Sequence, residues 1–90
     1  DRTLGDLVHE VAAQRDGVVS AIDCARISRI ARLAGAPTDP GAGILLLKQV
    51  GEAVRKGEPL CRIYAREGAD FGFAIDSAAE DAGFQVGGQA

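Results

Sequence analysis

The stretch Val50–Ile63 constrains the fold of this chain more than any other. It reads VGEAVRKGEPLCRI, with Gly51 and Gly57 between apolar residues and Pro59 two residues after Gly57. A glycine inside a strand pattern marks a bend or a bulge, and Pro59 fixes its own φ while it pushes Glu58 toward extended geometry. The stretch therefore predicts a strand that turns sharp corners, with Gly57 at positive φ, and it excludes a helix.

The length and composition limit the size and the partners of the fold. Ninety residues with 47% hydrophobic and 26% charged residues suit one ordinary domain with a modest core and no large catalytic cleft. The net charge of −3 implies neither a nucleic-acid nor a membrane partner. The longest apolar run, Ile44–Leu47, is far too short to span a bilayer, and no signal peptide is recognisable, so we expect a cytoplasmic location.

The N-terminal third predicts two strands and a hairpin. Asp1–Asp6 is polar and indicates a linker from an upstream domain. Leu7–Ala13 and Val18–Ile22 are apolar runs with strand character, and Asp16-Gly17 lies between them. Because Asp-Gly tolerates the positive φ of a tight primed turn, the two runs are expected to pair with each other.

Two segments predict amphipathic helices. Cys24–Ala34 has Asp23 as N-cap, Gly35 as the residue after its C-terminus and Pro37 beyond. Its apolar residues recur at helical spacing, at Ile27, Ile30, Ala31 and Ala34. A second helix, over about Asp70–Asp81, is predicted by Phe71, Ala74, Ile75, Ala78 and Ala82, with Gly83 after its end.

The remaining segments predict a loop and two more strands. Ala36–Gly43 is rich in Pro and Gly and predicts a loop. Ile44–Leu47 has four consecutive apolar residues, which favour a strand with both faces covered at the centre of the core. Phe84–Val86 is long enough for a short edge strand, and Gly87–Ala90 is expected to fray. Together these segments predict an α+β domain with a bent antiparallel β-core and two helices.

The residues that could carry chemistry form no recognisable active site. His9 lies in the first strand with no Ser or Cys at nucleophile spacing, which favours a structural or surface role. Cys24 and Cys61 lack metal or redox spacing and are expected to be buried thiols rather than a disulfide. Gly41-Ala42-Gly43 opens a strand, so it lacks the helix N-terminus of a phosphate cradle.

A carrier function is the first alternative. The run Val50–Ile63 resembles the bent strand pair of biotinyl and lipoyl barrel-sandwich modules, in which a lysine is displayed at a hairpin tip. Here Lys48 and Lys56 have the wrong flanking residues for either modification. The two predicted helices are also unusual for a carrier, which leaves a free-standing ligand-binding module without a modified lysine as the form this alternative takes.

The first predicted helix carries a candidate interface. Arg26, Arg29 and Arg32 lie around the side opposite its apolar stripe, where they form either a solvated face or a contact to an acidic partner or a phosphate. Leu33, Tyr64 and Phe84 lie at the margins of the stripes and strands. These six residues are the candidate interface, with scattered surface apolar residues as the alternative.

In order along the chain, several blocks resemble the C-terminal domain of pyrimidine nucleoside phosphorylases. These blocks are Gln14–Val19, Ile22-Asp23, Leu33–Pro37, Ala42–Ile44, Val50–Leu60 and Ile63–Ala65. The similarity runs from Leu7 to about Ala82. The Leu33–Pro37 and Ile63–Ala65 blocks are more similar to the longer thymidine/AMP phosphorylase branch. The chain also contains no Met and starts at Asp1, so we expect an excised piece of a larger protein.

The resemblance implies a role within a pentosyltransferase. In this family phosphate, the co-substrate, attacks C1′ of a nucleoside or nucleotide and releases the base and a sugar 1-phosphate. In this family the catalytic and binding residues lie in upstream domains. The resemblance therefore implies no catalytic, substrate-binding or metal residue and no cofactor in this fragment. It implies a linker at 1–6, an α/β-hammerhead-like domain at 7–86 with a barrel-sandwich-type core, and a tail at 87–90.

The expected partners are the upstream catalytic domains of the same chain and further copies in a homo-oligomer. The substrate of the parent is open between a pyrimidine nucleoside, as for thymidine phosphorylase, and AMP. An assembly domain of an unrelated enzyme is the remaining alternative.

Overall fold

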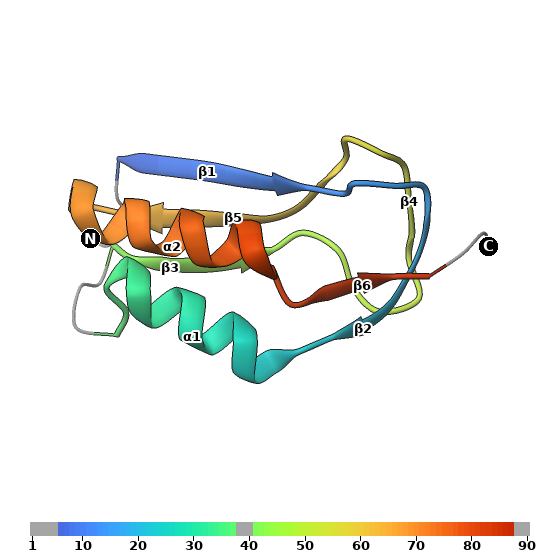
Figure 1. Cartoon of the computed structure of the whole chain (residues 1–90), viewed down its shortest axis with the longest axis horizontal. Helices are drawn as coiled ribbons and strands as arrows, with labels where there is room; N and C mark the ends of the chain where they lie inside the picture. The colour runs from blue at the N-terminus through green and yellow to red at the C-terminus, as the bar shows by residue number, and fades with distance from the viewer. Residues whose placement is uncertain (1–5, 38–40, 88–90) are drawn as a thin grey trace.

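Two small antiparallel sheets and two helices make up the fold. The computed structural model describes residues 6–37 and 41–87 (Figure 1). The elements, in chain order, are β1 (Leu7–Ala12), β2 (Gly17–Ile22), α1 (Cys24–Ala34), β3 (Gly43–Leu46), β4 (Ala53–Val54), β5 (Pro59–Ala65), α2 (Gly68–Glu80) and β6 (Phe84–Val86). The first sheet has the strand order β1-β5-β3, and the second has the order β4-β2-β6. Figure 1 shows both helices along the first sheet, with the second sheet beyond their ends.

β5 is the central strand of the first sheet, and its side chains contribute to both hydrophobic cores of the domain. Its residues Cys61, Ile63 and Ala65 are buried, and Ile63 pairs with His9 of β1 on one side and Ile44 of β3 on the other. α1 packs on β3 and β5, and α2 packs on β5 and β1, so the two helices cover one face of this sheet. Because side chains alternate along a strand, Arg62 and Tyr64 lie on the other face.

The core beneath the helices is built largely from small side chains. It contains Ile30 and Ala34 of α1, Ile63 and Ala65 of β5, and Ala74 and Ala78 of α2. Alanines at these positions let the backbones of both helices approach the sheet closely, which suits a chain with few large apolar residues. A second core at the other end contains Ala13, Val19, Val54 and Leu60.

The predicted hairpin between the first two strands is wrong. Both strands form, but β1 pairs with β5 and β2 pairs with β4 and β6. The carboxylate of Asp16 accepts a 2.7 Å hydrogen bond from the amide of Lys56 instead of stabilising a turn between β1 and β2. Ala13 likewise exchanges backbone hydrogen bonds with Gly57 and Glu58. Long-range pairing with the bent stretch therefore outweighs the local turn signal of Asp16-Gly17.

The prediction that Ile44–Leu47 is the covered centre of the core is also wrong. β3 is an edge strand, and the side chain of Leu45 is 46% exposed on the uncovered face of the sheet. The centre is β5. The apolar run was interpreted as a strand covered on both faces, but the described part of this chain covers only one.

Other predictions are confirmed. α1 has the predicted bounds, with the side chain of Asp23 accepting from the amide of Arg26 and with Gly35 at φ 125°. α2 ends at Glu80 and β6 is an edge strand. In the bent stretch, Gly51 and Gly57 have φ values of 97° and 93°, and the corner at Gly57 separates β4 from β5. The architecture is α+β, as predicted.

The ends of the chain are described only in part. The expected linker at 1–6 falls almost entirely outside the described residues, as does most of the expected tail. Gly87 is described, and its amide donates a 2.8 Å hydrogen bond to the carbonyl of Val18, so the frayed tail expected from Gly87 onward does not include Gly87 itself.

Candidate docking surfaces

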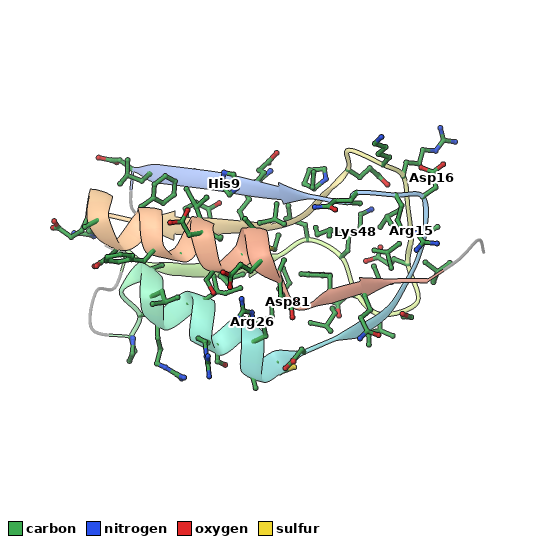
Figure 2. All side chains as sticks on the ribbon, in the orientation of Figure 1. His9, Arg15, Asp16, Arg26, Lys48 and Asp81 are labelled. Atoms are coloured by element: carbon green, nitrogen blue, oxygen red, sulfur yellow. The ribbon has the colours of Figure 1, made fainter. Side chains whose placement is uncertain are left out.

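Arg26 binds α2 within the same chain. Its Nε donates to the carbonyl of Asp81 and its Nη2 to the carbonyl of Ser77, both at 2.7 Å. These carbonyls lie at the C-terminal end of α2, where backbone acceptors lack helical partners and the helix dipole favours a cation. Figure 2 shows Arg26 and Asp81 close together between the two helices. The guanidinium group thus joins the start of α1 to the end of α2, and the two neighbouring helices run antiparallel (Figure 1).

The other α1 residues of the candidate interface are on the outer surface. Arg29 and Arg32 are exposed, and Leu33 is 36% exposed. They share this surface with Phe73 of α2, whose side chain is 60% exposed. Phe73 was not predicted as an interface residue, because the helix was recognised from its buried apolar stripe and Phe73 falls outside that stripe. A large aromatic residue out of phase with an apolar stripe was the available signal.

Tyr64 lies on the opposite side of the first sheet. Its neighbours in the ladder are Val8 of β1 and Gly43 of β3, and the next row along the same face contains Glu10, Arg62 and Leu45. We call this surface the open face. Val8 is 48% exposed on it, and Arg62 donates a 2.8 Å hydrogen bond to Glu10. Hydrogen bonds with Glu10, first, and with Tyr64 raise the pKa of Arg62, so these three side chains form one cluster.

Phe84 belongs to neither surface. It is half-buried against the second core, and it helps to line a small cavity between the end of β1, the end of α2 and β6. The volume of this cavity is about 260 Å³, below the range of about 300–1,000 Å³ usual for small-molecule sites. Its charged lining residues are Arg15, Glu80 and Asp81. The six candidate residues therefore do not form one surface: four lie on α1, Tyr64 lies on the open face and Phe84 is half-buried against the second core.

The remaining candidate groups have structural surroundings. Cys61 is buried in β5 as expected, and burial raises the pKa of its thiol to about 11, so it is protonated at neutral pH. Cys24 is exposed, contrary to expectation, because it occupies the first position of α1, away from the core. Lys48 lies 3.6 Å from Glu58. The pKa of Glu58 is lowered chiefly by the hydrogen bond from the backbone of Arg55.

The described residues contain neither a cluster of metal ligands nor a helix suited to a bilayer. Within residues 6–37 and 41–87, no group of three or more His, Cys, Asp or Glu side chains could hold a metal ion. Neither of the helices there has the length and apolar character needed to cross a bilayer.

Comparison with known proteins decides the family. The model of the pyrimidine nucleoside phosphorylase C-terminal domain matches residues 18–85. The chain belongs to this family. The match covers every element except β1, the first residue of β2 and the last residue of β6, so the resemblance found in the sequence blocks extends through both sheets and both helices.

Curated relatives cover nearly the whole chain. A protein of Rhodopseudomonas palustris (strain BisB18) is 54% identical over 94% of this chain, and one of Bradyrhizobium sp. (strain BTAi1 / ATCC BAA-1182) is 51% identical over 90%. A protein of Methylococcus capsulatus is 46% identical over 92%. Each of the three has the name "Putative thymidine phosphorylase". The chain spans only about one sixth of the length of these relatives, 16–17%.

Proposed function

We propose that this chain is the C-terminal structural and assembly domain of a thymidine phosphorylase, called the parent enzyme below. The parent would cleave a pyrimidine nucleoside with phosphate as co-substrate, giving the base and a pentose 1-phosphate, and its upstream domains would hold the catalytic residues. One observation carries the proposal: 94% of this chain matches only 17% of a relative named for that activity.

The open face supports docking onto the upstream domains. Val8 and Leu45 expose apolar side chains on it, and Tyr64 and Arg62 lie between them. Aromatic and arginine side chains beside apolar ones are typical of protein interfaces. β1, at the edge of this sheet, is also the first element of the domain, so an upstream domain would connect to the chain beside the open face. We therefore assign this face to the parent enzyme's own upstream domains.

The proposal extends to the domain organisation, location and substrate of the parent enzyme. Residues 7–86 would form an α/β-hammerhead-like domain with a barrel-sandwich-type core, residues 1–6 would be a linker and 87–90 a tail. The parent would be a cytoplasmic homo-oligomer whose C-terminal domain needs no cofactor and binds neither nucleic acid nor membrane. The names of the relatives favour a nucleoside over AMP as its substrate.

The test compares the parent enzyme with a version truncated before Asp1, by sizing chromatography and by phosphorolysis of thymidine, uridine and AMP. We expect the truncated enzyme to lose its higher oligomer, or its stability as that oligomer, while it keeps residual catalysis. A version that lacks only residues 88–90 is the control and should behave like the parent. An unchanged oligomer with unchanged stability would refute the assembly role, and turnover by the isolated chain would refute the catalytic role of the upstream domains.

A further inference from the structure

The two helices carry opposite charges. α1 contains three arginines and no acidic residue, and α2 contains Asp70, Asp76 and Glu80 and no basic residue. The separation means that the outer surface of the domain has a basic half and an acidic half.

These halves form one continuous surface. α1 and α2 are antiparallel neighbours that cover the same face of the first sheet, so their outward sides look in the same direction (Figure 1). We call this surface the helical layer. Leu33 lies two helical turns after Arg26, whose guanidinium group reaches α2, so Leu33 is on the side of α1 next to α2. Phe73 exposes the largest apolar area of the layer from α2.

The charges of the helical layer are not neutralised within the domain. Arg29 and Arg32 of α1 are exposed, as are Asp76 and Glu80 of α2. In the part of the chain that the structure describes, the salt bridges join Lys48 to Glu58 and Arg62 to Glu10, and neither involves the helical layer. The surface thus combines two unpaired rows of opposite charge with exposed apolar side chains.

We propose that the helical layer binds a second copy of this chain, with α1 of each copy lying on α2 of the other. The two copies would be related by a two-fold axis that runs parallel to the helices. Such an axis places each basic helix over an acidic helix, and the complementary contact occurs twice. An in-plane axis perpendicular to the helices would instead place α1 on α1 and α2 on α2, with like charges opposed. The charge pattern therefore selects both the partner and its orientation.

The contact is small and depends on charge. Helices of 11 and 13 residues are about 16 and 20 Å long, so each copy contributes a surface at the low end of specific interfaces. We expect weak self-association of the isolated chain that becomes weaker as salt is added, because exposed charges are screened. In the parent enzyme, the same contact would add to whatever joins the upstream domains, through a high effective concentration.

The inference deepens the proposed assembly role and rests on it for its purpose, but its test uses this chain alone. The result for this chain is therefore independent of the truncation experiment, and failure of one can be distinguished from failure of the other. Sedimentation equilibrium of the 90-residue chain is measured in low salt up to about 1 mM, and circular dichroism checks that each variant is folded. The chain should be in monomer–dimer equilibrium and should dissociate about tenfold more readily in high salt.

Charge reversal tests the orientation. R29E/R32E makes both helices acidic and should weaken the dimer at least about tenfold, since like charges then face each other. R29E/R32E/D76K/E80K exchanges the two signs and should restore the dimer. R55E/K56E makes the same change in net charge on exposed residues outside the helical layer and should leave the dimer unchanged.

A mixture provides a second measurement that does not depend on the fourfold variant. R29E/R32E and D76K/E80K should each self-associate at least about tenfold more weakly than the wild type when alone, and they should form a heterodimer when mixed in equal amounts. A wild-type chain that stays monomeric, or folded double variants that self-associate like the wild type, would overturn the proposal. So would a mixture that forms no heterodimer.

Discussion

The two faces of the β1-β5-β3 sheet differ although the same strands make them. On the face beneath the helices, Cys61, Ile63 and Ala65 of β5 are buried almost completely. On the open face, Arg62 and Tyr64 of the same strand are only half-buried, and Leu45 of β3 is half-exposed. The covered face supplies side chains to the core beneath the helices, whereas the open face leaves its apolar side chains partly exposed. The docking proposal assigns these apolar side chains to a contact outside the domain.

Substitution on the two faces should separate them by the largest effect. Ile63 is fully buried under both helices, so Ile63→Ala should lower the free energy of unfolding by about 2–5 kcal/mol. The matched change Leu45→Ala on the open face should cost less than about 1 kcal/mol in the isolated chain. Urea denaturation of both variants measures the difference. Equal losses would mean that the open face is part of the core.

The buried Cys61 of the covered face should make the stability of the chain depend on pH. Burial raises the pKa of Cys61 from 9.0 to about 11 in the folded chain, so the unfolded chain loses this proton first as the pH rises. The contribution to stability is therefore complete below pH 9 and is lost between about pH 9 and 11, by about 2–3 kcal/mol at most. Denaturation at several pH values measures it, and Cys61→Ala should flatten the decline.

Thiol labelling provides the control for that prediction. Cys24 is exposed and Cys61 is buried, so one thiol should react rapidly in the native chain and two should react in urea. Rapid reaction of both thiols in the folded chain would show that the covered face opens to solvent.

Arg26 and Arg29 distinguish a residue of the fold from a residue of the surface. Arg26→Ala should cost about 1–3 kcal/mol because it removes two charge-assisted hydrogen bonds from the end of α2. Arg29→Ala removes a charge of the same sign from the same helix and should change stability by less than about 0.5 kcal/mol. Thermal unfolding at a concentration where the chain is monomeric compares them. If Arg26→Ala were as harmless as Arg29→Ala, the bond between the helices would be dispensable.

Two glycines with open surroundings should respond in opposite directions. Gly57 has φ 93° at the corner before β5, so Gly57→Ala should cost about 1 kcal/mol through backbone strain alone, since nothing lies within 4 Å of an added Cβ. Gly72 is inside α2, also with nothing within 4 Å, and Gly72→Ala should stabilise by about 0.5–1 kcal/mol. Thermal melts of both variants show the sign. A neutral Gly57→Ala would mean that this corner is looser than its φ indicates.

Local signals in the sequence predicted the local structure well. Asp23 and Gly35 defined α1 to the residue, and Gly51 and Gly57 marked the corners of the bent stretch, because caps and positive φ depend on single residues. Strand pairing could not be predicted in the same way. The Asp16-Gly17 signal favoured a hairpin, but Asp16 binds the amide of Lys56, forty residues away.

The candidate surface was predicted only in part, for a related reason. The six residues were predicted from their positions relative to apolar stripes. Such a position indicates that a side chain lies outside the core, but not on which surface of the domain it lies. Arg26 binds α2, Tyr64 lies on the open face, and Phe84 is half-buried against the second core. Phe73 was missed, and the opposite charges of α1 and α2 gain meaning only once the two helices are known to be neighbours.

The claim that the open face docks the domain onto its parent is tested most directly by Leu45→Glu, measured in two settings. In the 90-residue chain this change should be nearly neutral, because Leu45 is half-exposed and stands opposite Arg62, which could pair with the new carboxylate. In the parent enzyme it should lower the midpoint of thermal unfolding by several degrees, because a charge would be buried in the contact. Val50→Glu replaces another exposed apolar residue away from the open face and should be neutral in both. An equally small effect of Leu45→Glu in the chain and in the parent would contradict the claim.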